Sequence, residues 1–430
     1  MMRPYTEYQQ SDISWLGKVP KHWTKNKFKF LLNEKPKTQN LELPCGSISF
    51  GHVVFKDSER LSEETKAAYQ EVLSGEFLVN PLNLNYDLKS LRTALADIDV
   101  IVSSGYIVLK SLDVVDKAYL RWLLYLFDVR HMKTLGAGIR QTISFKDIAD
   151  CAVYIPNDSE QKAIATFLDR ETQRIDSLIE EKQTFIKLLK EKRQALISHV
   201  VTKGLNPNVE MQDSSIEWIG QVPKHWEKCR VKQVSSFITS GPRGWSDFIS
   251  DNGNAIFLQS GDLNNELGLN LAKAKKVSPP DGAEGQRTQL HLDDVVVCIT
   301  GANTGRVALV KELDSTVYIN QHLSLIRPIG EKVRSKYLAY FLSSEAGSRY
   351  YALEQYGLKE GLSLKNVAET PLMLPPVSEQ TSIEKYLDKA LATLSSLLTS
   401  VEESIHLLKE RRTSLISAAV TGKIDVRETV

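Results

Sequence analysis

The sequence predicts a mixed α/β (α+β) fold with two similar globular domains and two long helices that separate them, arranged as a pseudo-twofold internal repeat. Three observations support this prediction. Isoleucine recurs every eleven residues between positions 159 and 204, the same apolar pattern returns 219 residues later, and a tryptophan-rich motif occurs twice in corresponding places.

The first long helix is expected over residues 159–204. Its apolar residues share one face, because eleven residues make almost three whole turns of an α-helix. Residues 159–203 include neither proline nor glycine, and Gly204 stands where a glycine cap is common. A helix of roughly 40 residues is about 60 Å long. One domain core does not need such a length, so the apolar stripe requires a partner.

The partner is predicted in the same chain, at residues 378–423. The segment LLKEKRQALIS at 188–198 returns there as LLKERRTSLIS at 407–417. Matching apolar stripes can be buried against each other or against a third protein, and the shared register favours pairing within the chain. The residues predicted to pair are Ile164, Ile175, Ile186 and Ile197 of the first helix and Ile383, Leu394, Ile405 and Ile416 of the second.

Each globular domain begins with the motif W-[LI]-G-x-V-P-K-H-W, at 15–23 and again at 218–226. Such a repeat indicates two copies of one structural plan. Two aromatic residues and a proline in an extended segment favour a packing role, in which the motif ties the domain to its helix, over direct nucleic-acid contact by His22 or His225. The predicted boundaries are 1–158 for the first domain, 159–204 for the central helix, 205–377 for the second domain, 378–423 for the C-terminal helix and 424–430 for a tail.

The two domains repeat one order of elements between the motif and the long helix. Apolar runs predict strands at 76–80, 99–110, 151–156, 294–300 and 316–328 and short helices at 118–127 and 336–344. Between the matched strands the sequences diverge, as expected when one frame carries different loops.

The composition is that of an ordinary folded protein, with 42% apolar residues, 25% charged residues and a net charge of +1. Affinity for nucleic acid must therefore come from local patches or from a partner. The four cysteines form no C-x-x-C pair, which is typical of a reducing, cytoplasmic environment. The N-terminus has no secretory signal and no apolar run is long enough to span a bilayer, so we expect no association with membranes.

No catalytic motif is evident in the sequence. Residues 80–83 (NPLN) resemble the N-P-P-[YF] loop of adenine methyltransferases but lack the second proline and the aromatic residue that stacks on a flipped base. Asp158, Glu160 and Lys162 lie at a predicted helix start, where acidic residues are expected as caps and not as a metal site. We therefore expect neither a catalytic residue nor a metal site in this chain.

Binding is the function that remains. Lysines cluster after the first tryptophan motif and could neutralise phosphates, although a merely solvated face is an equal alternative. Turn-rich loops of both domains carry Asn, Gln, Arg and Lys, which can reach base edges, but for any single residue a structural role in a turn is more common. The candidate DNA-binding residues are Lys25, Lys27, Asn83, Asn85, Lys89, Arg92, Arg140, Gln141, Arg243, Asn303, Arg306, Gln321 and Lys359.

These features together resemble the specificity subunit of type I restriction-modification systems. The resemblance rests on the S-E-Q helix starts at 159–161 and 378–380, the duplicated helix ending in L-I-S, the tryptophan motif, and the segments ISFKDI at 143–148 and LSLKNV at 362–367. It implies two target-recognition domains, each reading one half of a split sequence in double-stranded DNA, and an antiparallel coiled coil that sets the gap between the half-sites.

The same resemblance implies that the chain is non-catalytic and has partners. Two modification subunits would use S-adenosylmethionine to methylate adenine, and restriction subunits would use ATP, with Mg, to translocate and cut DNA. No cofactor is expected in this chain. The alternatives are a coiled-coil scaffold that does not touch DNA, or a divergent stand-alone adenine methyltransferase.

Overall fold

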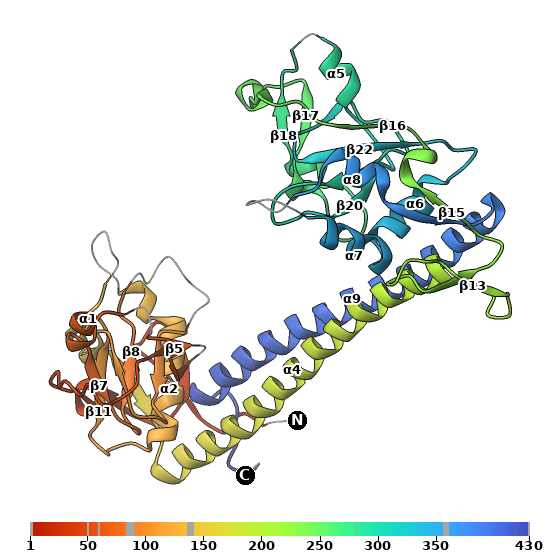
Figure 1. Ribbon diagram of the computed structural model, residues 1–430. Coiled ribbons are helices and arrows are strands. Elements are labelled where there is room, and N and C mark those ends of the chain that lie inside the picture. The colour runs from red at the N-terminus through yellow and green to blue at the C-terminus, as the bar shows by residue number, and fades with distance from the viewer. Residues whose placement is uncertain are drawn as a thin grey trace. The chain divides into compact units, whose positions relative to one another are not determined.

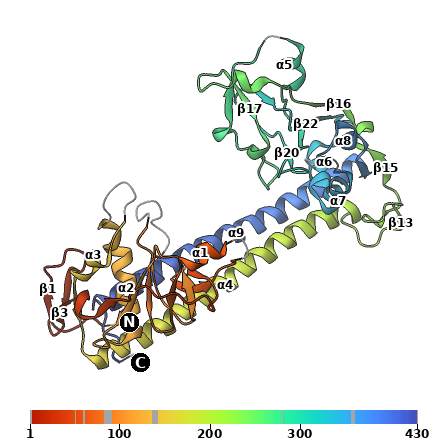
Figure 2. The same ribbon diagram turned by 60° about the vertical axis from the view of Figure 1, so that its left-hand side comes forward.

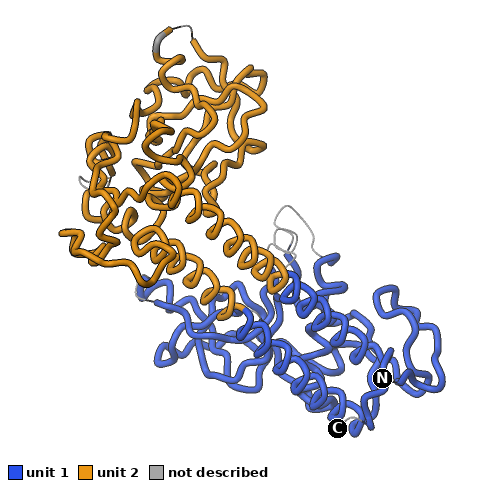
Figure 3. The backbone as a smooth tube through the Cα atoms, turned by 90° about the vertical axis from the view of Figure 1, so that its right-hand side faces the viewer, with its two compact units in different colours: residues 1–182, 403–430 blue, residues 183–402 orange. Residues whose placement is uncertain are grey.

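The computed structural model describes residues 3–49, 51–58, 61–82, 91–135, 142–280, 282–355 and 361–428. The chain divides into two compact units, shown in Figure 3: unit 1 is 1–182 with 403–430, and unit 2 is 183–402. Each unit contains one globular domain and part of both long helices, α4 (Asp158–Lys203) and α9 (Val377–Val420) (Figure 1). Among the described residues, none of the helices has the length and apolar character needed to cross a membrane.

The two long helices pair in an antiparallel sense within each unit. In unit 1, Ile164 near the start of α4 shares a core with Ile416 near the end of α9. In unit 2, Ile197 near the end of α4 shares a core with Ile383 near the start of α9. All eight residues predicted to pair are buried except Ile186, which is partly exposed. The predicted coiled coil is therefore confirmed.

The ends of the helices differ from the prediction in one detail. The backbone N–H of Glu160 donates to Oδ1 of Asn157 at 3.0 Å, so the cap of α4 is Asn157. Asp158 and Glu160 lie in the first turn of α4, as predicted for acidic residues at a helix start, but neither is the cap itself. At their C-termini both helices end at a glycine with positive φ, Gly204 at +75° and Gly422 at +69°. This backbone region is strained for other residues, and the glycine stop predicted at 204 is confirmed.

Unit 1 is built on a six-stranded sheet with the order β4-β11-β8-β9-β6-β5. The elements of this domain are β1 (Tyr8–Gln10), β2 (Lys18–Pro20), β3 (Thr24–Lys27), β4 (Leu32–Glu34), β5 (Gly46–Ser49), β6 (His52–Phe55), α1 (Glu63–Ala67), β7 (Gln70–Val72), β8 (Phe77–Val79), β9 (Thr93–Leu95), β10 (Val100–Val102), β11 (Ile107–Ser111), α2 (Lys117–Arg130), α3 (Phe145–Ala149) and β12 (Ala152–Ile155). Its core joins α2, the tryptophan motif and the start of α4.

Unit 2 repeats the central part of this plan. Its four-stranded sheet, β16-β22-β19-β20, has the same order and the same antiparallel pairing as β4-β11-β8-β9 in unit 1. The elements are β13 (Met211–Asp213), β14 (Gln221–Pro223), β15 (Glu227–Arg230), β16 (Ser235–Ser240), β17 (Ala255–Leu258), β18 (Lys275–Val277), α5 (Ala283–Thr288), β19 (Val295–Cys298), β20 (Val307–Leu309), β21 (Val317–Ile319), β22 (Leu323–Pro328), α6 (Ser335–Ser343), α7 (Glu345–Glu354), α8 (Leu364–Glu369) and β23 (Pro371–Leu374). Figure 2 shows α6, α7 and α8 gathered between this sheet and the long helices.

Two predicted strands are each broken by a turn. The run predicted at 99–110 forms β10 and β11 around residues 103–106, and the run predicted at 316–328 forms β21 and β22 around residues 320–322. Apolar residues continue on both sides of each turn, which is why the pattern alone suggested one strand. Both turns lie at the same edge of the matched sheets.

Candidate nucleic-acid interface

The tryptophan motif of unit 1 is anchored on a buried carboxylate, that of Glu160 in the first S-E-Q segment. The indole N–H of Trp23 donates to Oε1 of Glu160 at 3.0 Å, and Nε2 of His22 lies 2.8 Å from Oε2. The hydroxyl of Tyr5 also donates to Oε1, and burial together with this bond raises the pKa of Tyr5. The predicted packing role of the motif is confirmed, and the side chain of Glu160 is fully buried in this anchor.

Unit 2 repeats the anchor with Glu379 of the second S-E-Q segment. Nε2 of His225 lies 2.8 Å from Oε2 of Glu379, and the indole N–H of Trp226 donates to the same oxygen at 3.2 Å. The side chain of Glu379 is 25% exposed, whereas that of Glu160 is 0% exposed. The duplication of the glutamate together with the H-W pair is the sequence signal that indicates this contact.

The glutamine of each S-E-Q segment ties the long helix to the short helix of its domain. Oε1 of Gln161 accepts from the backbone N–H of Asp116, the residue that caps α2, at 2.9 Å. Oε1 of Gln380 accepts from the backbone N–H of Arg334, at the start of α6, at 2.8 Å. Glutamate and glutamine therefore fix the sheet of each unit to its part of the paired helices.

The polar loops of unit 2 meet at one edge of its sheet. Strands β16 and β19 end at this edge, and β20 and β22 begin there, as their registers require. We call the loops 241–244, 299–306 and 320–322 the recognition edge of unit 2. An added Cβ on Gly241 would lie 2.1 Å from the carbonyl oxygen of Ile319, so the first loop is in close backbone contact with the third. The candidates Arg243, Asn303, Arg306 and Gln321 are therefore brought together.

Two of these candidates hold the loops in place. The side-chain amide of Asn303 donates to the carbonyl oxygen of Ser260 at 3.2 Å, and the guanidinium of Arg306 donates to that of Leu263 at 2.9 Å. Both link the loop 299–306 to the segment that follows β17. Arg243, in contrast, is exposed, and no hydrogen bond of its side chain to another described residue is found. Contact of these residues with DNA remains a prediction.

In unit 1 the corresponding edge is formed by the end of β8 and the starts of β9 and β11. Arg92 precedes β9 and is only 8% exposed. Its backbone N–H donates to Oδ2 of Asp128 in α2 at 2.5 Å, and burial raises the pKa of Asp128 to about 6. This position favours a role in holding the edge. The candidates Asn83, Asn85, Lys89, Arg140 and Gln141 of unit 1 and Lys359 of unit 2 lie outside the described residues.

The basic segment after the first motif forms ion pairs within unit 1. Lys25 pairs with Asp12, and Nζ of Lys27 lies 3.7 Å from Oδ1 of Asp150. Lys25 is exposed and Lys27 is partly exposed, and their contact with phosphates remains a prediction. Lys35 of the same cluster is buried between Glu71 and Glu76, 2.9 Å from a carboxylate oxygen of each, so it cannot neutralise a phosphate without breaking these pairs.

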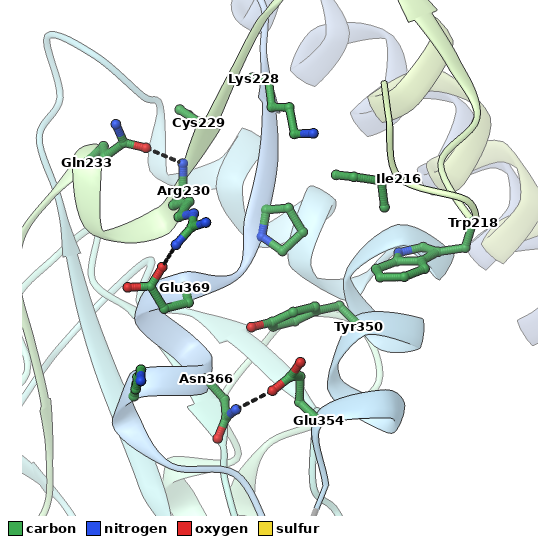
Figure 4. A pocket seen from close by; sticks show the side chains of 12 residues that line it. Ile216, Trp218, Lys228, Cys229, Arg230, Gln233, Tyr350, Glu354, Asn366 and Glu369 are labelled. Carbon is green, nitrogen blue, oxygen red and sulfur yellow. Dashed lines mark hydrogen bonds and ion pairs between the residues drawn. The ribbon is translucent and has the colours of Figure 1, made fainter. Parts of the chain in front are cut away.

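An open cleft of about 800 Å³ lies elsewhere in unit 2, between the tryptophan motif, β15 and helices α7 and α8. Figure 4 shows Trp218 and Tyr350 on one side and Lys228 above them. Its acidic groups already have partners, since Arg230 pairs with Glu369 and the side-chain amide of Asn366 donates to Glu354 at 2.6 Å. None of the residues that line it belongs to the recognition edge. The described residues include no group of three or more His, Cys, Asp or Glu side chains placed to hold a metal ion.

Two domains with matched sheets, each anchored on the paired helices by the same motif, define a protein built from two similar modules. Comparison with known proteins identifies the family to which this protein belongs. The family described as "Type I restriction modification DNA specificity domain" matches residues 86–188 and 223–406, more than half of the chain. The chain belongs to this family of type I restriction-modification specificity subunits.

Several relatives support this assignment. The type I restriction enzyme EcoBI specificity subunit of Escherichia coli is 24% identical over 297 residues, which cover 66% of this chain and 60% of that subunit. The MjaVIII specificity subunit of Methanocaldococcus jannaschii is 23% identical over 393 residues, covering 88% of this chain and 87% of that subunit.

Solved structures share the fold. A chain described in work on complex assembly and conformational transition of the type I R-M system has a TM-score of 0.68 at 16% identity, covering 94% of this chain and 98% of its own length. The HsdS subunit from Thermoanaerobacter tengcongensis has a TM-score of 0.50 at 17% identity, with the same coverage.

Proposed function

We propose that this chain is the non-catalytic DNA-recognition subunit of a type I restriction-modification complex, in which each globular domain reads one half of a bipartite target in double-stranded DNA. The observation that carries the proposal is the pair of matched sheets, β4-β11-β8-β9 and β16-β22-β19-β20, each fixed to the paired helices by a duplicated anchor. Family membership supports the same function.

Two modification subunits are proposed to dock on the paired helices. Leu188 of α4 and Leu407 of α9 occupy the same place in the repeated LLKE segment, one in each unit, and they are 54% and 64% exposed. Exposed apolar side chains at a charged helix surface are suited to burial in an interface. Because the repeat presents this leucine twice, two copies of one partner could bind in equivalent ways.

The chemistry is proposed to reside in the partners. S-adenosylmethionine would be held by the modification subunits, and ATP and Mg by the restriction subunits, in the cytoplasm where the DNA is. All four cysteines of this chain are free thiols, which suits a reducing compartment. This chain would supply sequence discrimination and geometry, because two linked modules add their base readout and the second binds at high effective concentration.

Methylome mapping of cells that carry the whole operon tests the proposal. We expect methylated adenines in one bipartite sequence. Insertion of one turn between Leu178 and Phe185, with the matching segment of α9, lengthens the pair by about 5 Å. At 3.4 Å per base pair, the gap should grow by one or two base pairs while both half-sites stay the same. Altered half-sites with an unchanged gap would contradict the proposed spacing role.

Three further measurements test the proposed partners and the alternatives. Leu188→Asp and Leu407→Asp should each release one modification subunit in native mass spectrometry, and the double variant should release both, whereas Lys190→Asp serves as an exposed control. The purified chain alone should transfer no methyl group from S-adenosylmethionine, since activity would support the stand-alone methyltransferase. If the complex shows no sequence-selective retention of DNA fragments, the scaffold alternative holds.

A further inference from the structure

The turn 320–322 connects β21 to β22 at the recognition edge of unit 2 and holds an ordered pair of polar side chains. The backbone N–H of His322 donates to Oδ1 of Asn320 at 3.0 Å, and Asn320 is itself buried. Nδ1 of His322 lies 2.5 Å from Oγ1 of Thr300 in the neighbouring loop. The turn is therefore held at the backbone of His322, and its imidazole is held by the neighbouring loop, although the side chain is exposed.

The hydrogen bonds of this pair define which atoms donate and which accept. The amide nitrogen of Gln321 lies 3.1 Å from Nε2 of His322. Because an amide nitrogen only donates, Nε2 accepts, so the neutral ring carries its proton on Nδ1 and donates it to Thr300. The Gln321 amide then keeps one N–H donor and the whole of its carbonyl oxygen for other partners.

A free donor and a free acceptor on one planar amide match the major-groove edge of adenine, which presents N7 as acceptor and the N6 amino group as donor. We propose that Gln321 reads an adenine in the half-site of unit 2, and that His322 and Thr300 act as positioning residues that hold its amide in the reading orientation. This inference rests on the proposed function, and it names one base and one side chain that carry the readout.

The surroundings of Gln321 favour this assignment over the neighbouring candidates. The side chains of Asn303 and Arg306 already donate to the backbone of the segment after β17, so they serve to hold the loop. Asn320 is buried and engaged in its own turn. Arg243 is exposed beside the same turn and suits a phosphate or a guanine, but no second residue orients it among those described.

The test uses the complex of this chain with its modification subunits and the target mapped for the wild type. Synthetic duplexes would carry each base-pair change in the half-site of unit 2, and one set would carry 7-deazaadenine, which lacks the N7 acceptor. At one adenine of this half-site, replacement by another base pair and replacement by 7-deazaadenine should each weaken binding by the wild type roughly 10- to 100-fold. Gln321→Ala should bind all of these duplexes equally, while the exposed Gln212→Ala control on β13 behaves as the wild type.

Two variants separate readout from loss of structure. Glutamate has the shape of glutamine but only accepts hydrogen bonds, so Gln321→Glu should lose the preference for adenine and gain one for cytosine, whose N4 amino group donates. His322→Ala should reduce discrimination at that base pair alone. In every variant the half-site of unit 1 and the melting temperature should stay unchanged.

The outcomes distinguish this inference from the proposed function. If the wild-type complex shows no sequence selectivity, the proposed function fails. If the wild type is selective but Gln321→Ala and Gln321→Glu keep its full pattern of discrimination, or no adenine of that half-site responds to 7-deazaadenine, the assignment of Gln321 is overturned and the proposed function stands.

Discussion

In unit 1 the carboxylate of Glu160 receives three side-chain donors in a fully buried site, whereas Glu379 in unit 2 receives two and is 25% exposed. The third donor is Tyr5, and Asn208 stands at the matching position of the second copy, where it is exposed. The histidine and tryptophan contacts occur in both copies, although they use both oxygens of Glu160 and a single oxygen of Glu379. Duplication has thus kept the contacts that bind each domain to the helices, while the number of donors and the burial of the glutamate differ between the copies.

The recognition edges differ far more than the anchors. The turn at 320–322 in unit 2 carries Asn, Gln and His, whereas the matching turn of unit 1 is Ser103-Ser104-Gly105-Tyr106. In unit 1 the ammonium group of Lys37 donates to the carbonyl oxygen of Ser104 at 2.8 Å, a contact with backbone only. The same edge therefore offers different chemistry in the two units, as two different half-sites would require.

The largest predicted effect concerns the anchors. Glu160→Ala leaves buried donors of Tyr5 and Trp23 without an acceptor and should lower the free energy of unfolding of unit 1 by about 3–5 kcal/mol. Glu379→Ala should cost clearly less in unit 2, because water can reach the freed donors. Hydrogen exchange of the amides in α2 and α6 measures the two units separately. The control is Glu7→Ala, because Glu7 is an exposed partner of Lys21. If Glu160→Ala and Glu379→Ala lowered the free energy of unfolding of their units by equal amounts, the difference inferred between the two anchors would be contradicted.

The second prediction concerns Asp128 in α2, which has no counterpart in unit 2. When Tyr119 is matched to Tyr337, both fully buried, Asp128 falls on Ala346. Burial raises the pKa of Asp128 to about 6, while an unfolded carboxyl group titrates near pH 4. Between these values the folded unit binds a proton that the unfolded chain lacks, so the free energy of unfolding rises as the pH falls from 7 towards 4, by at most about 3 kcal/mol.

Asp128→Asn is expected to abolish this gain, because its amide oxygen still accepts from the N–H of Arg92 but no group titrates. The measurement is the difference in unfolding free energy between wild type and variant at pH 5 and at pH 7.5, in which contributions of other carboxylates cancel. If the difference is the same at both values, Asp128 does not titrate in this range. Ala346→Ser in unit 2 is a matched polar substitution that should show no pH dependence.

The long helices could be predicted from the sequence because an apolar pattern of helical period that continues along a 46-residue helix fits few other structures. The turns at 103–106 and 320–322 could not, since apolar residues continue on both sides and the chain reverses only through contacts with other strands. Arg243, Asn303, Arg306 and Gln321 of unit 2 were brought together by the sheet, which no spacing in the sequence reveals. The role of Glu160 was missed because a glutamate in a first helical turn is usually a cap, and its burial depends on His22 and Trp23, about 140 residues earlier.

The smallest predicted effect concerns an ion pair that only one copy of the paired helices has. In unit 1 the guanidinium of Arg412 makes three hydrogen bonds to the carboxylate of Asp176, at 2.9 to 3.2 Å, whereas the shift of 219 residues places Arg193 and Ser395 at the matching positions of unit 2. Half of the Asp176 side chain is exposed, so solvent and salt screen the pair. Asp176→Ser should cost less than about 1 kcal/mol in unit 1, and the cost should vanish in high salt.

The reciprocal change, Ser395→Asp, should give unit 2 the pair with Arg193 at low salt, but with a smaller gain, because Glu266 now accepts from Oγ of Ser395 at 3.2 Å and would repel the new carboxylate. Urea unfolding of the two variants and of the double variant at low and high ionic strength measures both effects. A gain in unit 2 that survives high salt would mean that packing, and not charge, distinguishes the two halves of the helix pair. A gain that disappears at high salt would mean that the two halves of the helix pair share one backbone register and differ only in their charged side chains.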